Sequence, residues 1–369
     1  MSSNSQDFCT APASSEYKEL ILDTYRHVDF SQYSFCVKIY IHVIRKNDGT
    51  GGQSHSNIIE ALGYLDAAFN PHNIFFNWNN SINYINNTNL YNHPGGILNI
   101  TTYDHSDGVD IYLFDDETNH PVSGHGYGST DGIGLSSKLL VTGSWGDNLE
   151  HPLVRSHILS HEMGHVLFLW HTHHGTVIEA GDPDQCAELV NGDIYNRVLC
   201  GDYISDTSAV PGMGYNVDIN TCEWLGSGVD VNNDPYTPDE LNRMSYTEPV
   251  CMDYFTPKQS ARMKTALALL SHLKLVSYYH PLGNPCLAVD SGLIYYPNSA
   301  NEILHLDLRD KPTATYNYQI YNNIGNIVLS GQSQNILKTI DISALDVGVY
   351  FLHFYENGDL IIRQIVIDR

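Results

Sequence analysis

The feature that most constrains this chain is the segment His161-Glu162-Met163-Gly164-His165, followed by His171. Two histidines four residues apart project from one face of a helix, so both imidazoles can reach the same metal ion. Glu162 follows the first histidine, where its carboxylate can reach a water molecule bound to that ion. Three protein ligands with one open coordination position are typical of a catalytic zinc site rather than a closed structural one.

The chemistry that this arrangement favours is hydrolysis of a peptide bond. A zinc ion held by His161, His165 and His171 lowers the pKa of its bound water and polarises a carbonyl group, while Glu162 acts as the general base. We therefore predict a zinc-dependent metalloendopeptidase, which is a hydrolase. H-E-x-x-H also occurs by chance in helices without a zinc site. A further alternative, motivated by Phe168, is a zinc-binding pseudo-protease that no longer cleaves.

The third histidine requires a turn directly after the helix. His171 lies six residues beyond His165, and the spacing resembles the metzincin signature H-E-x-x-H-x-x-G-x-x-H. Phe168 stands at the position of the turn glycine, where a bulky residue in a left-handed conformation is strained by roughly 1–2 kcal/mol. His173 and His174 are substitute ligands if the turn is built differently.

Charge and hydropathy narrow the class of protein. The chain has 18 Lys and Arg against 42 Asp and Glu, a formal net charge of −24. This balance argues against nucleic-acid partners and anionic membranes, and it would favour calcium or basic substrates. A solvated acidic surface is the preferred explanation for most of the carboxylates. No run of 18 apolar residues is present, so we expect no transmembrane segment. Residues 1–20 lack the apolar core of a signal peptide, so an exported protein would begin here after a removed signal.

Cysteine usage is consistent with export to an oxidising compartment. None of the seven cysteines has the C-x-x-C spacing of a metal or redox site. Two disulfides can be formed within the central part of the chain, Cys186 with Cys200 and Cys222 with Cys251.

The remaining cysteines, Cys9, Cys36 and Cys286, leave one thiol that the sequence does not place. Cys9 lies in the polar, weakly helical N-terminal segment of residues 1–34. Its thiolate either ends an inhibitory pro-segment that blocks the zinc or forms a disulfide with Cys36. We favour the disulfide.

Hydrophobic patterning predicts alternating strands and helices before the histidine motif. Strands are expected at residues 36–45, 74–78 and 109–114, with a helix at 58–69. Residues 124–141 read as a looped edge strand, which in zinc peptidases holds an extended substrate by β-augmentation. The helix that carries the motif is expected to span residues 153–169, and a closing helix to span 257–273.

Acidic loops after the motif suggest a second metal. Residues 201–207, Gly-Asp-Tyr-Ile-Ser-Asp-Thr, place oxygen ligands closely together, which suits a hard cation such as Ca²⁺. Residues 230–234 are a weaker second candidate, and acidic turns without metal are more common. Neither segment matches an EF-hand.

These motifs together resemble the pappalysin family of metzincin metalloproteases. The similarity covers residues 35–273 in the family's order. It comprises the first strand and turn at 37–52, the histidine motif, the acidic loop at 201–207, Met244-Ser245-Tyr246, and residues 251–259.

The resemblance implies a two-lobed catalytic domain with the zinc helix at the floor of the cleft. His161, His165 and His171 would bind Zn²⁺, and Glu162 would be the general base. Met244 would form the Met-turn below the site, and Tyr246 would stabilise the oxyanion. Asp202 and Thr207 would belong to the calcium loop, and the disulfide Cys222–Cys251 would tie that loop to the Met-turn.

The C-terminal portion has an all-β pattern, with strands separated by turn residues at Gly331, Gly348 and Asn357-Gly358. Residues 295–304, 340–345 and 348–352 resemble the C-terminal sorting domain of the type IX secretion system of Bacteroidetes. Ser299 stands where that motif usually has proline. The alternative is a generic sandwich, as in an adhesin-like surface protein.

We therefore expect an α+β fold with three parts. Residues 1–34 are an N-terminal segment, a possible pro-segment remnant. Residues 35–283 form the two-lobed catalytic domain, and residues 284–369 form a β-sandwich sorting domain. The expected protein is secreted or displayed on a bacterial cell surface, uses Zn²⁺ and Ca²⁺, cleaves proteins or peptides, and is handled by an export machinery.

Overall fold

The computed structural model describes residues 30–115, 127–143, 145, 154–176, 186–213, 216–281, 286, 294–296, 300–307, 316–333, 337–356 and 359–368. The chain forms two compact units. The first unit comprises residues 1–32 and 37–277, and the second comprises residues 33–36 and 278–369.

This division differs from the expected domain boundaries at residues 34/35 and 283/284. The second unit begins six residues earlier than expected and also takes in residues 33–36. Two contacts explain the difference. Strand β7 (Ser277–Pro281) pairs with strand β1 (Tyr33–Arg45), and Cys36 forms a disulfide with Cys286. The N-terminal end of β1 is therefore tied to the C-terminal part of the chain.

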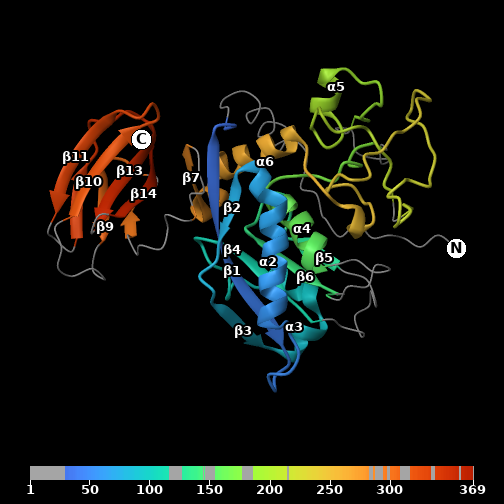
Figure 1. Ribbon diagram of the computed structural model, residues 1–369, viewed down its shortest axis with the longest axis horizontal. Coiled ribbons are helices and arrows are strands. Elements are labelled where there is room, and N and C mark those ends of the chain that lie inside the picture. The colour runs from blue at the N-terminus through green and yellow to red at the C-terminus, as the bar shows by residue number, and fades with distance from the viewer. Residues whose placement is uncertain are drawn as a thin grey trace. The chain divides into compact units, whose positions relative to one another are not determined.

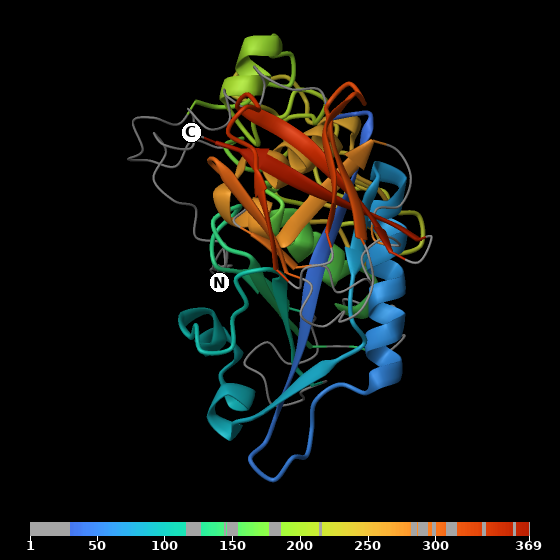
Figure 2. The same cartoon turned by 90° about the vertical axis from the view of Figure 1, so that its left-hand side faces the viewer.

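A seven-stranded sheet organises the first unit. Its main path runs β2-β1-β4-β6-β5, and β3 and β7 also pair with β1. The central pairs β1–β4 and β4–β6 are parallel, whereas the end strand β5 is antiparallel to β6. Figure 2 shows the long strand β1 in blue running through the sheet. The other strands are β2 (Ile74–Asn77), β3 (Ile82–Asn86), β4 (Val109–Leu113), β5 (Tyr127–Thr130) and β6 (Lys138–Thr142).

Helices α2 (His55–Phe69) and α4 (Leu159–Val166) pack against each other beside the sheet (Figure 1). Ser54 caps α2 by accepting a hydrogen bond from the amide of Asn57, and the buried side chains of α2 follow helical spacing. The remaining α-helices of the described residues are α3 (Thr88–Asn92), α5 (Ile194–Leu199), α6 (Pro257–Leu269) and α7 (Ser271–Val276). Short 3-10 turns lie at Asn70–His72, Pro94–Asn99 and Pro249–Cys251.

Two expected helices are shorter than the patterns suggested. The motif helix begins with a π-helical turn (Val154–Ile158), and its α-helical part ends at Val166 instead of residue 169. The closing helix stops at Leu269 because Leu270 is extended, with ψ of 126°, and α7 then continues. Residues 1–29 of the expected N-terminal segment, with Cys9, lie outside the described residues.

The second unit contains two antiparallel sheets in its described residues. One runs β11-β10-β13-β14 and the other β12-β9-β8. Buried side chains from both sheets, including Leu304, Ile320, Leu352 and Ile365, form one hydrophobic cluster. The strands are β8 (Ile294–Tyr296), β9 (Ile303–Asp307), β10 (Tyr316–Asn322), β11 (Ile327–Ser333), β12 (Leu337–Asp341), β13 (Gly348–Glu356) and β14 (Asp359–Ile367).

Candidate metal centre and its surroundings

The structure brings His161, His165 and His171 together, and we call these three residues the histidine triad. Helix α4 places His161 and His165 one turn apart on one face. The three Nε2 atoms lie 3.1, 3.1 and 3.0 Å from one another. Two nitrogens bound to one tetrahedral zinc, with bonds of about 2.0–2.1 Å, lie about 3.3 Å apart, so the triad fits that ion closely.

Hydrogen bonds at the other ring nitrogens fix where the protons lie. His161 Nδ1 is 2.7 Å from the carbonyl oxygen of Arg243, and His165 Nδ1 is 2.7 Å from that of Leu169. A carbonyl oxygen only accepts, so each Nδ1 must carry the proton and donate it. In the neutral rings, the Nε2 lone pairs of His161 and His165 therefore point at each other with no proton between them.

Burial also keeps the triad uncharged. It lowers the pKa of His161 to about 4, and the pKa values of His165 and His171 fall well below the ordinary value for the same reason. Uncharged imidazoles whose lone pairs converge repel one another unless a cation lies between them. The donor set and its protonation state therefore fit a divalent metal ion.

Phe168 adopts the left-handed conformation that a glycine would supply at this turn. Its φ is +75°, and its amide and that of Leu169 donate to the carbonyls of His165 and Gly164 at the end of α4. The expected strain of about 1–2 kcal/mol is therefore present. The side chain is fully buried, and Gly134 makes room for it, since a Cβ at position 134 would lie 2.3 Å from the Phe168 ring. Burial worth about 1.5–3 kcal/mol offsets the strain.

The neighbouring histidines do not replace His171. Among the described residues, the metal-ligand group contains His161, His165 and His171 but neither His173 nor His174. The ring of His173 stacks on that of His171 at 4.9 Å, and His174 packs against Trp170 at 4.1 Å.

Glu162 is buried beside the triad, and β5 passes directly over it. Burial raises its pKa to about 8, and its Oε2 has no hydrogen-bond partner among the described residues. A Cβ at Gly128 of β5 would lie 2.2 Å from Glu162 Cγ. Glycine is therefore required at position 128. Sequence reasoning did not single it out, although it lies in the expected edge strand.

The segment around Met244 supports both the helix and the third histidine. Met244 is fully buried, and a Cβ at Gly164 would lie 2.7 Å from its sulfur. The Met244 carbonyl accepts a hydrogen bond from the amide of Thr172, next to His171. Asn242 holds the turn by accepting from the Met244 amide, and it exchanges two hydrogen bonds with Gln259 of α6.

Arg243 was not predicted, yet it contacts helix α4 at His161 and Ser160 and the chain after the Met-turn at Asp253. Its carbonyl orients His161, and its guanidinium donates to Ser160 Oγ at 2.8 Å and to the Asp253 carbonyl at 2.6 Å. Burial lowers its pKa to about 10. The one signal in the sequence was its position immediately before the expected Met-turn.

Tyr246 lies beside the triad and is half-buried. Its ring centroid is 4.3 Å from that of His171 and 6.3 Å from that of His161. The ring of His173 lies 4.8 Å away on the same tyrosine. The side chain is therefore close enough to the triad to act on a group bound there.

A buried carboxylate pair, Glu188 and Asp202, occupies the expected calcium loop. Among the described residues, no group meets hydrogen-bond geometry with either Glu188 carboxylate oxygen or with Asp202 Oδ2, although the Asp202 amide and Arg197 are near enough to Glu188 to lower its pKa in part. Burial raises both pKa values, and the proximity of the two charges raises that of Glu188 further. Gly201 permits the approach, since a Cβ there would lie 2.0 Å from Glu188 Oε2. Unpartnered carboxylate oxygens of this kind fit Ca²⁺.

The other acidic residues of the expected calcium segments have protein partners. The Thr207 hydroxyl lies 2.9 Å from Asp202 Oδ1. Asp206 accepts from Thr256 and from the Lys258 amide at the start of α6. Asp230 accepts the backbone amides of Val190, Asn232 and Asp234, so its carboxylate in the weaker candidate at 230–234 already has protein partners. Glu188 was missed because it lies 14 residues before Asp202, outside the motif.

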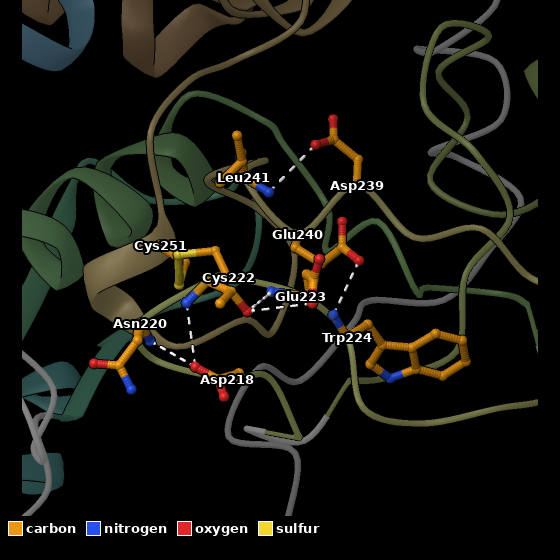
Figure 3. Close-up of a disulfide and its surroundings, with 10 residues drawn as sticks. Asp218, Asn220, Cys222, Glu223, Trp224, Asp239, Glu240, Leu241 and Cys251 are labelled. Carbon is orange, nitrogen blue, oxygen red and sulfur yellow. Dashed lines mark hydrogen bonds between the residues drawn. A yellow bond between two sulfur atoms is a disulfide. The ribbon is translucent and has the colours of Figure 1, made fainter.

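Both expected central disulfides are present, Cys186–Cys200 and Cys222–Cys251. Figure 3 shows Cys222–Cys251 beside a turn in which the Asn220 amide donates to the Asp218 carboxylate. In the same view, the Trp224 amide donates to Glu240. The disulfide thus fastens the irregular segment after residue 216 to the turn that follows Met244.

The expected disulfide between Cys9 and Cys36 is wrong. Cys36 pairs with Cys286, 250 residues away in the sequence. The cause is the pairing of β1 with β7, which brings the start of the chain's first strand to the segment that enters the second unit. Sequence separation alone gave no reason to prefer this partner.

Comparison with known proteins assigns the end of the chain. Residues 294–368 match the family model of the secretion system C-terminal sorting domain. No curated protein matches the chain. Within the described residues, no helix is long and apolar enough to cross a membrane. The chain therefore carries a type IX secretion sorting domain at its C-terminal end, which marks it as a secreted or cell-surface bacterial protein handled by that export machinery.

Proposed function

We propose that the first unit is a zinc-dependent endopeptidase of the pappalysin type, exported by means of the C-terminal sorting domain. One observation carries the proposal. Three uncharged imidazoles converge through Nε2 atoms 3.0–3.1 Å apart, and the buried Glu162, which follows His161 in α4, has an unpartnered oxygen. The carbonyl partners of His161 and His165 leave lone pairs on both of their Nε2 atoms, so at most the His171 proton could lie among the three nitrogens, whereas a cation would satisfy all three.

Zinc held by His161, His165 and His171 supplies a Lewis acid that polarises the scissile carbonyl and makes a water molecule more acidic. The carbonyl oxygens of Arg243 and Leu169 orient two of the rings through Nδ1–H, which also increases the basicity of the ligand nitrogens. The turn at Phe168 brings the third ring to the same point.

Glu162 would act as the general base. In the metal-free protein its burial raises the pKa to about 8, so the carboxyl is protonated at neutral pH. A nearby cation favours the carboxylate and lowers that pKa again. Glu162 can then accept a proton from the attacking water and pass it to the departing amine.

Tyr246 would stabilise the negative charge that develops on the carbonyl oxygen. Its half-buried ring centroid lies 4.3 Å from that of His171, so its hydroxyl is carried next to one of the three histidines. A hydroxyl that donates a hydrogen bond there acts mainly in the transition state, so it raises kcat.

The substrate would be an extended segment of a protein or peptide lying along β5. This strand ends the main path of the sheet and runs antiparallel to β6. Gly128 brings the β5 backbone against Glu162. A peptide that adds to this edge would therefore present its backbone close to the general base.

We further propose that the carboxylate pair Glu188 and Asp202 binds Ca²⁺. Two buried carboxylates with three unpartnered oxygens repel each other unless they are protonated or share a cation. The role of the ion would be structural, since it would fix the loop that precedes residues 202–207.

The alternative of a pseudo-protease rested on Phe168. That residue adopts the left-handed conformation of the glycine it replaces, and His171 lies with the other two histidines. The substitution therefore gives no geometric reason for inactivity.

Cleavage by the purified full chain tests the proposal. The chain, supplied with Zn²⁺ and Ca²⁺, is incubated with an unfolded protein mixture, and new termini are identified by mass spectrometry. Glu162→Gln keeps the shape of the side chain but removes the base, so we expect cleavage to fall by about 10²–10⁴-fold with unchanged zinc content. The matched control is Glu302→Gln, at an exposed position of the second unit.

The zinc requirement is tested in the same assay. A chelator selective for transition metals should stop cleavage, and added zinc should restore it. The proposal fails if the wild-type chain cleaves nothing with both ions present, or if Glu162→Gln cleaves as fast as Glu302→Gln.

A further inference from the structure

A second group of metal-ligating side chains lies in the first unit, away from the triad in sequence. It consists of His42 on β1, Asp110 on β4 and His105 in the loop before β4, and we call it the aspartate cluster. In the β1–β4 register, His42 is opposite Tyr112, so His42 and Asp110 project from the same face of the sheet. Neither histidine attracted attention in the sequence.

The contacts within the aspartate cluster are short. Asp110 Oδ1 is 2.8 Å from His42 Nε2 and 2.6 Å from His105 Nδ1. Its Oδ2 accepts the backbone amide of His105 at 2.7 Å. Asn83 on β3 lies 3.0 Å from His42 Nδ1 and fixes the orientation of that ring.

The charge of Asp110 has no permanent cation beside it. Its ion-pair partners among the described residues are the two histidines, which are charged only when protonated. The nearby lysines are engaged elsewhere, Lys38 with Asp107 and Lys138 with Asp104. Asp110 is almost completely buried, so a carboxylate there is costly unless its hydrogen bonds or a cation compensate it.

We propose that His42, His105 and Asp110 form a second site for a divalent transition metal such as Zn²⁺. Two imidazoles and one carboxylate are a donor set that such ions use widely in proteins. The three atoms that would bind are His42 Nε2, His105 Nδ1 and Asp110 Oδ1, which lie within 4.8 Å of one another.

Binding changes tautomers and releases no proton. The His42 proton moves from Nε2 to Nδ1, where the Asn83 side chain accepts it after its amide turns over. The His105 proton moves from Nδ1 to Nε2, which solvent can hydrate because the side chain is 36% exposed. The Asp110 carboxylate then coordinates the metal instead of accepting hydrogen bonds from the two imidazole N–H groups.

The ligands must also separate slightly. Two ligand atoms on one zinc lie about 3.2 Å apart, whereas the present hydrogen bonds measure 2.6 and 2.8 Å. His42 and Asp110 lie on the paired strands β1 and β4, which hold them in place. His105 therefore makes most of the movement that separates the three ligand atoms. It lies in an irregular segment between Asn99 and Val109. A bound metal would clamp this segment to the sheet.

Metal content of the full chain tests the site. Protein stripped of metal is equilibrated with about three equivalents of Zn²⁺, enough to fill both proposed sites, in buffer containing excess Ca²⁺ for the carboxylate pair, and bound zinc is counted after dialysis. We expect His105→Ala to hold one equivalent less than the wild type. The control His93→Ala removes an exposed histidine and should hold the wild-type amount. Equal zinc in His105→Ala and the wild type overturns the proposal.

A measurement on the wild-type chain covers the case in which His105→Ala does not fold. Diethyl pyrocarbonate modifies an imidazole nitrogen that has a free lone pair, and mass spectrometry locates the modified residue. In the metal-free protein, Nε2 of the half-exposed His105 is such a nitrogen. Zinc should suppress modification of His105 and leave that of His93 unchanged. Equal modification of His105 with and without zinc overturns the proposal.

Discussion

The histidine triad and the aspartate cluster differ in where their ring protons lie. In the triad, carbonyl oxygens take the Nδ1 protons of His161 and His165, so bare Nε2 lone pairs face each other. In the aspartate cluster, the nitrogens that face inward point at a carboxylate oxygen and can donate to it. In the first arrangement at most one proton, that of His171, could lie among the three nitrogens, whereas in the second each contact can hold a proton.

The difference shows that proximity of histidines does not by itself describe a metal site. In each imidazole, the hydrogen-bond partner of the outward-facing nitrogen decides whether the inward-facing nitrogen carries a proton and donates or carries a lone pair. A triad held by carbonyls is strained when metal-free, so zinc should contribute strongly to stability there. The aspartate cluster should lose little when metal-free, because hydrogen bonds replace the metal.

The largest expected effect concerns zinc-dependent stability at the triad. At a free zinc concentration of about 1,000 times the dissociation constant, binding adds about 4 kcal/mol to the free energy of unfolding. His165→Ala removes a ligand and should lose this gain, whereas His93→Ala should keep it. Denaturant unfolding with and without zinc measures the difference. If zinc raises the free energy of unfolding of His165→Ala as much as that of the wild type, the triad is not the site through which zinc stabilises the protein.

The next effect concerns the aspartate cluster in metal-free protein. Asp110→Asn keeps the shape but places an amide N–H₂ where N–H groups donate to both carboxylate oxygens. We expect a loss of about 2–3 kcal/mol in the free energy of unfolding, because a buried donor remains unsatisfied. Unfolding in the presence of a chelator measures it. A loss below about 0.5 kcal/mol would mean that these hydrogen bonds do not stabilise the protein.

A smaller effect tests the turn that completes the triad. Phe168→Ala and Phe168→Gly both lose the buried ring, but only alanine keeps a Cβ at φ of +75°. The glycine variant should therefore be more stable than the alanine variant by about 1 kcal/mol, which reverses their usual order. The denaturant midpoints of the Phe168→Ala and Phe168→Gly variants measure this difference in stability. An alanine variant of equal or greater stability would show that the turn relaxes.

The smallest effect extends the comparison to oxygen ligands. The raised pKa values of Glu188 and Asp202 mean that the folded, calcium-free protein binds more protons than the unfolded chain. Their contribution to stability is therefore fully present below the ordinary carboxyl pKa of about 4 and is lost as pH rises through the raised values.

Calcium should reverse that loss. We expect Ca²⁺ to raise the melting temperature by about 2–4 °C at pH 8 and by little at pH 5, where the carboxyls are protonated. Glu188→Gln should abolish the calcium effect. A melting temperature that calcium shifts equally at both pH values would contradict the assignment.

Sequence reasoning reached the features that depend on local geometry. The spacing of His161 and His165 required a helix, and the glycine position of the motif predicted the left-handed conformation of Phe168. Most strands of the sheet were expected from alternation. The central disulfides were also expected, because few pairings were available within that part of the chain.

Other residues could not be found in this way. Gly128 approaches Glu162 only because β5 crosses the end of α4, and Glu188 reaches Asp202 only because Gly201 leaves room. Arg243 lies 82 residues from the histidine that it orients. No periodicity connects such positions, since their separation is set by the packing of whole elements.

The sequence by itself determined the three histidines of the triad, the helix that carries two of them and the all-β character of the C-terminal part, because side-chain periodicity and turn chemistry act over a few residues. Only the tertiary structure decided the Cys36–Cys286 disulfide, the carboxylate pair and the aspartate cluster. Each of these joins strands or loops far apart in the chain, and long-range register depends on how the complete sheet and its helices pack.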